Sequence, residues 1–261
     1  MTSDLSSRIR GAFGRSLRHV ATTGSTNSDA LGWAAEGADE GAVVVADHQT
    51  GGRGRWGRDW TSAPGDSLLF SVILRPHPTP PDRLGLLSVL GGVATAEAVG
   101  EETGLDARVK WPNDVVIDGR KLAGVLAEAR TQGGEVSVAV LGIGLNLSLP
   151  GDLAPEVAGC ATSLDRHLPP DHELRAALLG TILERIERWY AGLSADGGVS
   201  LVRRAEELSS MIGRDVSLRF SDGRTLEALA TGLSPAGGLR VEADGRSRVV
   251  DVAEVTRVRP R

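Results

Sequence analysis

Two periodicities in the apolar residues divide most of the chain into short strands and longer helices. Short apolar runs predict strands at about 42–46, 67–74, 107–110, 114–117, 121–129 and 135–147. Apolar residues at helical spacing predict a helix at about 171–192, and turn and N-cap residues at 23–27 indicate one at about 28–36. Further helices are expected at about 4–14, 83–103 and 197–211. Helices interspersed with strands in this way are typical of an α+β fold in which helices flank a mixed β-sheet.

The pattern changes after Gly213. Four short strands, at about 215–220, 225–232, 238–242 and 247–251, are separated by Asp-Gly and Gly-Gly turns. Such turns join antiparallel hairpins. We therefore expect two domains, a larger one at 1–212 and a small barrel-like β-domain at 213–261.

Composition is that of an ordinary soluble protein, with 41% hydrophobic and 24% charged residues in 261. The net charge of −5 argues against a surface devoted to nucleic acid. We expect no membrane span and no signal peptide, since no apolar run approaches ~20 residues and the N-terminus lacks an apolar core. The single cysteine, Cys160, excludes an internal disulfide, so we expect a cytoplasmic protein with Cys160 packed inside.

The choice of basic residue is more informative than the net charge. Of 29 basic residues only two are lysines, Lys110 and Lys121. A lysine retained against this bias indicates a need for a compact ammonium instead of a planar guanidinium. The chain also has only three asparagines, Asn27, Asn113 and Asn146, and all of these residues lie within the segments described next.

The segment Gly51-Gly-Arg-Gly-Arg-Trp-Gly-Arg-Asp-Trp60, called here the Gly/Arg loop, carries the strongest candidate chemistry. Glycines let backbone N–H groups approach an anion, arginines bind phosphate oxygens bidentately, and a tryptophan can stack on a base. A flexible solvated loop or an RG-type nucleic-acid segment has the same pattern. It is neither a Walker A loop nor a Rossmann fingerprint.

Two further segments combine glycine with polar residues. In Lys110-Trp-Pro-Asn-Asp114 and Gly119-Arg-Lys-Leu-Ala-Gly124, a lysine can neutralise charge developing on a phosphate, although a hairpin with a surface lysine is the simpler interpretation. In Leu141-Gly-Ile-Gly-Leu-Asn146, both glycines lie on one face of a strand. Close approach of a ligand and tight strand–helix packing explain that pattern equally well.

Taken together, these motifs resemble those of the biotin–protein ligase family. The likeness covers most of 20–165 and rests on five motifs in order: Gly24–Asn27, Gln49–Trp60, Lys110–Asp114, Gly119–Gly124 and Gly142–Asn146. It implies a biotin/lipoate ligase-like catalytic domain followed by an SH3-like C-terminal domain. Larger members carry an N-terminal DNA-binding domain. Because the Ser-Thr-Asn motif begins at Ser25, we expect the monofunctional type, with no DNA binding.

The resemblance implies that biotin is activated with ATP and Mg²⁺ and transferred to a lysine on the biotin carboxyl carrier domain of an acyl-CoA carboxylase. Mg²⁺ would be bound mainly through the ATP phosphates. The implied catalytic residues are Lys121, Arg55 and Asp114. The implied binding residues are Ser25, Thr26, Asn27, Gln49, Gly52, Arg53, Arg55, Trp60, Asn113, Lys121, Gly124, Gly142, Gly144 and Asn146.

The resemblance also divides this set into subsites. Biotin would contact Ser25, Thr26 and Gln49, with the backbone at Gly52 and Arg53 closing on its ureido ring. Gly124 and Gly142 would lie beside the bicyclic ring and the valeryl chain. Arg53, Arg55 and Lys121 would face the phosphate and the biotin carboxylate, and Trp60 and Asn146 the adenine nucleotide. Asp114 would bind either the acceptor lysine or the metal-bound phosphate, and the role of Trp56 stays open.

Three alternatives remain at this level. A lipoate or octanoate ligase of the same fold would need a long apolar tunnel, against which the polar Ser25, Thr26 and Gln49 argue. A nucleic-acid-binding protein would use the Gly/Arg loop and the β-domain, which the acidic net charge disfavours. A non-catalytic scaffold built on the SH3-like domain would leave Lys121 and the Gly/Arg loop without a role.

Overall fold

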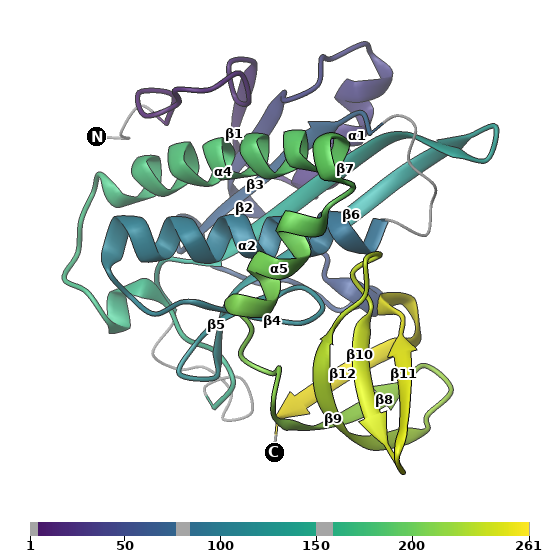
Figure 1. Ribbon diagram of the computed structural model, residues 1–261. Helices are drawn as coiled ribbons and strands as arrows, with labels where there is room; N and C mark the ends of the chain where they lie inside the picture. The colour runs from purple at the N-terminus through teal and green to yellow at the C-terminus, as the bar shows by residue number, and fades with distance from the viewer. Residues whose placement is uncertain (1–4, 77–83, 150–158, 261) are drawn as a thin grey trace.

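The computed structural model describes residues 5–76, 84–149 and 159–260. Its larger part is a seven-stranded mixed sheet in the order β1-β2-β3-β7-β6-β5-β4 (Figure 1). The strands are β1 (Leu17–Thr23), β2 (Val43–Gln49), β3 (Ser67–Leu74), β4 (Arg108–Lys110), β5 (Asp114–Ile117), β6 (Arg120–Gln132) and β7 (Glu135–Asn146). Only β1 and β2 pair in parallel; every other neighbouring pair of this sheet is antiparallel.

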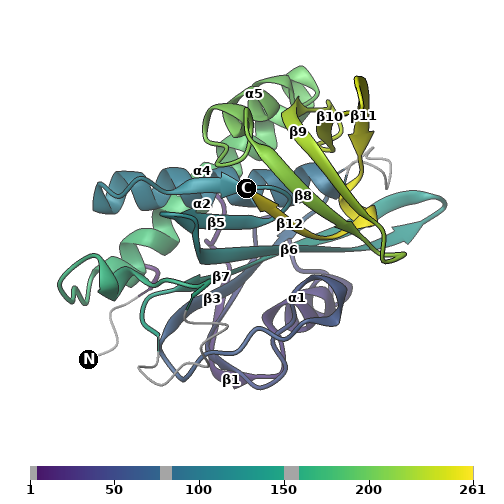
Figure 2. The ribbon, with the colours of Figure 1, turned by 90° about the horizontal axis from the view of Figure 1, so that it is seen from below.

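Helices cover both faces of this sheet. One face carries α2 (Leu84–Thr103), α4 (Leu174–Asp196) and α5 (Val199–Glu207), and the other carries α1 (Thr26–Ala35), as Figure 2 shows. The double cover explains why all eight residues of β3 are buried, as in sheets covered on both faces. Alternate β3 residues face opposite layers: Phe70 and Val72 enter the large core, whereas Ile73 packs beneath α1.

Helix α2 is long and apolar enough to cross a membrane, with 20 residues and a mean hydropathy of 1.3. This qualifies the expectation that no segment approaches that length. In the folded chain 72% of its apolar stretch is buried, and α2 packs between the sheet and α4. Its apolar character is therefore that of a core helix.

The C-terminal strands form a second, five-stranded antiparallel sheet in the order β11-β10-β9-β8-β12 (Figure 1). They are β8 (Asp215–Phe220), β9 (Thr225–Leu233), β10 (Leu239–Ala243), β11 (Arg246–Val250) and β12 (Val255–Pro260). The expected fold class is confirmed. The domain boundary at residue 212 stays a proposal, because the main hydrophobic cluster runs continuously through both sheets and Trp111 Nε1 donates to Gly237 O at 2.8 Å across them.

Three expectations about elements differ from the structure. The predicted helix at 4–14 is wrong, since its described residues form turns and bends that bury Leu5 and Phe13. Strand β1 was not predicted, because it is a sheet edge with few apolar residues. Strand β12 was also missed; its Val-Thr-Arg-Val-Arg pattern is short, and it forms by pairing with β8.

Candidate functional site

A cavity of about 300 Å³ opens on the α1 face of the large sheet. Its floor is the face of β5, β6 and β7 that presents Asp114, Gly124, Gly142 and Gly144. Strand register brings the glycines together, because Gly124 pairs directly with Gly144 and Asp114 pairs with Gly124. The Gly/Arg loop, the first turn of α1 and residues 255–259 of β12 form the walls.

Two side chains pack so close to the glycines of the floor that a larger residue would not fit there. A Cβ on Gly144 would lie 2.6 Å from the Trp60 ring, and one on Gly124 would lie 2.9 Å from it. A Cβ on Gly142 would overlap Asn27 Oδ1. Gly142 therefore allows the first turn of α1 to pack closely on β7, one of the two interpretations left open by the sequence, and Gly124 and Gly144 make room for the Trp60 ring.

The N-terminus of α1 is held by a polar network at one end of the cavity. Ser25 occupies the N-cap position but makes no side-chain cap; instead the backbone N–H of Thr26 donates to Gln49 Oε1 at 2.8 Å. This bond leaves Gln49 Nε2 directed towards Gly52, 3.1 Å from where a Cβ of that glycine would lie. The result is a small neutral polar subsite of hydroxyl and amide groups.

The Gly/Arg loop lies against the last strand of the chain. The Arg55 guanidinium donates to Val252 O and to Val255 O, the latter at 3.0 Å. Trp56 Nε1 donates to Val255 O at 3.0 Å, and Arg58 donates to Thr256 O at 2.6 Å. Trp56, whose role was open, thus joins the loop to the C-terminal sheet while 48% of it stays exposed.

Both lysines of the chain line the cavity. Lys121 Nζ lies 2.6 Å from Asp114 Oδ1 and 5.3 Å from the centroid of the Trp60 ring. Burial lowers the pKa of Lys110, and the nearby positive charges of Lys121 and Arg259 lower it further, against an opposing effect of Asp114. Burial also lowers the pKa of Arg55, partly offset by Asp114, although a guanidinium stays charged at neutral pH.

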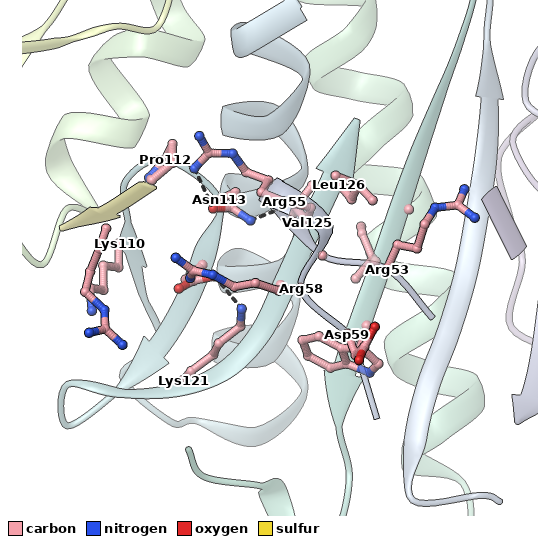
Figure 3. A pocket seen from close by; sticks show the side chains of 18 of the residues that line it. Arg53, Arg55, Arg58, Asp59, Lys110, Pro112, Asn113, Lys121, Val125 and Leu126 are labelled. Atoms are coloured by element: carbon pink, nitrogen blue, oxygen red, sulfur yellow. Dashed lines mark hydrogen bonds and ion pairs between the residues drawn. The ribbon is translucent and has the colours of Figure 1, made fainter. Parts of the chain in front are cut away.

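The lining carries seven basic side chains and two acidic ones, Asp59 and Asp114. This excess of cations within a chain of net charge −5 indicates a polyanionic ligand. Figure 3 shows Arg55 beside Asn113 and Arg58 between Arg55 and Lys121, whereas the Arg53 guanidinium points away from them. Arg53 bonds to Ser28 and Glu128 instead.

Nearly all the residues implied by the resemblance come together here. The exceptions are Gly52, which does not line the cavity, and Asn146, which is buried beneath it and donates to Thr162 O at 3.0 Å. The implied site did not include Lys110, Arg58 or β12. The scarcity of lysine could have identified Lys110 as a site residue, since it is one of only two lysines in the chain. The sequence of β12 carries no local pattern that would mark it as part of the site.

Cys160 was expected to be packed, and this is wrong. It is exposed and lines the cavity, because its backbone runs beside the start of β6, where the N–H of Lys121 donates to Cys160 O at 2.8 Å. Within the described residues, no three His, Cys, Asp or Glu side chains form a metal-binding group. Asp114 is already paired with Lys121, so the lining does not fit a site that holds Mg²⁺ by protein ligands alone.

Comparison with known proteins agrees with this geometry. Residues 20–146 match the Biotin/lipoate A/B protein ligase family. The biotin–[acetyl-CoA-carboxylase] ligase of Mycobacterium tuberculosis is 35% identical over 95% of this chain and 91% of its own length. The bifunctional ligase/repressor BirA of Bacillus subtilis is 32% identical over 93% of this chain and 74% of its own length.

A solved structure extends the likeness to three dimensions. The biotin protein ligase of Aquifex aeolicus, in complex with biotin and ATP, matches with a TM-score of 0.80 at 27% identity, covering 95% of this chain and 100% of that one. Sequence and fold thus agree over nearly the whole length, including the C-terminal sheet that closes the cationic cavity. The chain belongs to the biotin–protein ligase family.

Proposed function

We propose that this protein activates biotin with ATP to biotinoyl-5′-AMP and transfers the biotinoyl group to a lysine of the biotin carboxyl carrier domain of an acyl-CoA carboxylase. One observation carries the proposal: a strongly cationic cavity is joined to a small neutral polar subsite. The cationic part suits the phosphates of ATP. The polar part, around Gln49 and Thr26, suits a neutral ring with both hydrogen-bond donors and acceptors, such as the ureido ring of biotin.

In the first step an oxygen of the biotin carboxylate attacks the α-phosphorus of ATP. A carboxylate–phosphorus bond forms, the bond to the β-phosphate oxygen breaks, and pyrophosphate leaves. Negative charge builds on the phosphoryl oxygens, and Lys121 is placed to stabilise it electrostatically. The ion pair with Asp114 fixes the ammonium in the cavity. Arg55 and Arg58 add positive charge from the loop side.

In the second step the neutral amine of the acceptor lysine attacks the carbonyl carbon of the anhydride. The amide bond forms, the bond to AMP breaks, and the amine proton passes to solvent or to a nearby base. Asp114 is the carboxylate of the lining that lies beside Lys121, so it can orient the incoming amine. Its pairing with Lys121 makes Asp114 also a positioning residue for the Lys121 ammonium.

Because the described residues of the lining do not build a metal site, we propose that Mg²⁺ arrives bound to the phosphates of ATP. A cytoplasmic location and the absence of specific DNA binding belong to the same proposal. A fluorescence anisotropy titration with a DNA pool enriched for binding sequences tests the latter. Saturable, sequence-selective binding that resists salt would contradict it.

The decisive experiment offers the protein ATP and Mg²⁺ with radiolabelled biotin, lipoate or octanoate in separate reactions and resolves the acyl-AMP by chromatography. We expect an adenylate from biotin alone. An adenylate formed from lipoate or octanoate and not from biotin would replace the proposal with the alternative ligase activity. Addition of a carrier domain then tests transfer, through covalent labelling that survives denaturation.

A further inference from the structure

A carboxylate outside the cationic cluster lies beneath the start of the Gly/Arg loop. Glu128 is on β6, four residues beyond Gly124 and on the same face of the sheet. Its Oε2 accepts a hydrogen bond from Asn27 Nδ2 at 2.6 Å. Both of its oxygens also lie within 3.3 Å of the Arg53 guanidinium. One side chain therefore joins the sheet, the first turn of α1 and the loop.

The contact with Glu128 decides which way the Asn27 amide faces. An ionised carboxylate only accepts hydrogen bonds, so Asn27 must present its nitrogen to Glu128. Its oxygen then faces Ser71, whose hydroxyl lies 2.6 Å away. Ser71 Oγ is in turn 2.7 Å from Thr26 Oγ1, and Thr26 contacts Gln49. Glu128 thus begins a continuous chain of polar contacts that ends in the neutral subsite.

This chain sets the donor and acceptor pattern of the neutral subsite. Asn27, Thr26 and Ser71 are buried, so each unpaired polar atom among them carries a desolvation cost. If the Asn27 amide turns over, the Ser71 and Thr26 hydroxyls must reorient as well. A ligand recognised by its own donors and acceptors then meets a different surface, whereas a ligand bound by charge alone does not.

The contact of Glu128 with Arg53 anchors the Gly/Arg loop. Arg53 bonds to Glu128 and to Ser28 Oγ, the latter at 3.1 Å, at the point where the loop leaves β2 and crosses α1. The opposite side of the loop is held at Arg55 by the C-terminal strand. Arg53 is therefore occupied in binding the loop to the sheet, and Figure 3 shows its guanidinium directed away from Arg55 and Arg58.

We propose that Glu128 is a positioning residue for the carboxylic-acid substrate: through Asn27 it orients the polar groups of the neutral subsite, and through Arg53 it anchors the first part of the Gly/Arg loop. The inference rests on the proposed function in taking biotin as that substrate. Glu128 itself touches no reacting group.

The test exchanges the polarity of one hydrogen bond. Glu128→Gln introduces an amide that can present its oxygen to Asn27 only by turning its NH₂ group towards the Arg53 guanidinium, and Asn27→Asp places a carboxylate against Glu128. In the double variant the amide introduced at position 128 can donate to the carboxylate introduced at position 27. Ser71 still donates to that carboxylate, so the chain of contacts is restored without a change in total charge. The matched control is Glu101→Gln, which removes an ion pair with Arg185 between α2 and α4, away from the cavity.

We expect Glu128→Gln to raise the KM for biotin about tenfold, the size of effect that one charged hydrogen bond produces, and to leave the KM for ATP within about twofold. Asn27→Asp should act similarly, and the double variant should recover to within about threefold of the wild type. The control should change neither KM. An unchanged KM for biotin, or an equal rise in both KM values with no recovery in the double variant, overturns the proposal.

A second measurement is independent of catalysis. Amide hydrogen exchange of residues 51–60 should be faster in Glu128→Gln than in the wild type and in the control, because the Arg53 anchor is weakened. Unchanged exchange there overturns the anchoring role. If the wild type forms an adenylate only from another carboxylic acid, the proposed function fails. The same KM comparison, made with that acid, and the exchange measurement still decide the role of Glu128.

Discussion

Removal of the Arg55 side chain should release the reaction intermediate prematurely. In the closed loop the guanidinium contacts Val252 O and Val255 O, and it lies 3.4 Å from Asn113 Oδ1. Arg55→Ala deletes these bonds without adding a glycine to the loop. The loop already contains glycines at 51, 52, 54 and 57, and ordering a backbone residue costs about 1–2 kcal/mol. Closure therefore depends on such contacts.

The magnitude follows from the number and exposure of the bonds. Each hydrogen bond to a charged group contributes about 1.5–3 kcal/mol when buried, but water replaces part of that here because Arg55 is only half-buried. We expect a net loss of about 2 kcal/mol in the free energy of loop closure, which corresponds to about 30-fold faster escape of biotinoyl-AMP. Trp56→Phe removes one neutral bond, to Val255 O, and should accelerate escape about fivefold.

The assay forms the adenylate from labelled biotin and ATP in a single turnover, then follows its dissociation by rapid gel filtration. Escaped adenylate also acylates lysines on bystander albumin, which a blot for biotin detects. The expected order of escape is Arg55→Ala, then Trp56→Phe, then wild type. If Arg55→Ala makes the adenylate, retains it as long as the wild type does and leaves albumin unlabelled, the loop contacts do not control retention.

Three further outcomes are expected. Lys121→Ala should lower the rate of adenylation about 10²–10³-fold, while the biotin Kd measured by calorimetry should change less than about threefold. A near-wild-type single-turnover rate would refute the role of Lys121 in stabilising the phosphoryl charge. Gly144→Val should displace the Trp60 ring from the floor and abolish ATP binding while tryptophan fluorescence reports the movement; normal ATP affinity would show that the seat is dispensable. Because its pKa is lowered, Lys110 should lose its charge at a lower pH than an ordinary lysine, and the KM for ATP should rise as that charge is lost. Lys110→Arg should move this rise in KM to higher pH. Identical pH profiles of the KM for the two proteins would contradict this.

The strands and helices follow largely from local pattern. Strand β3, at Ser67–Leu74, was predicted with its observed limits, since a continuous apolar run between turns describes a strand buried on both faces. The expected helix at 4–14 failed because Leu5 and Phe13 have apolar partners elsewhere in the chain and need no helix to become buried. Strand β12 has little apolar pattern of its own and is stabilised by its partner β8.

The site shows the same division. The glycine spacing placed Gly142 and Gly144 on one face from sequence alone, because strand side chains alternate. Which side chains occupy that face, Asn27 and Trp60, depended on how α1 and the Gly/Arg loop pack over the sheet. The bias against lysine marked Lys110 and Lys121, and both line the cavity, but only the fold shows that Lys121 pairs with Asp114.

The sequence by itself determined most of the helices and strands, the order of the motifs and the chemical character of the site. The tertiary structure decided that β12 closes the cavity, that Arg53 binds Glu128 while Arg55 binds the C-terminal strand, and that Cys160 is exposed. The physical reason is the range of the interactions. Periodicity reports on neighbours a few positions apart. Arg55 and Val255 are 200 positions apart, and their contact forms only when the two sheets come together.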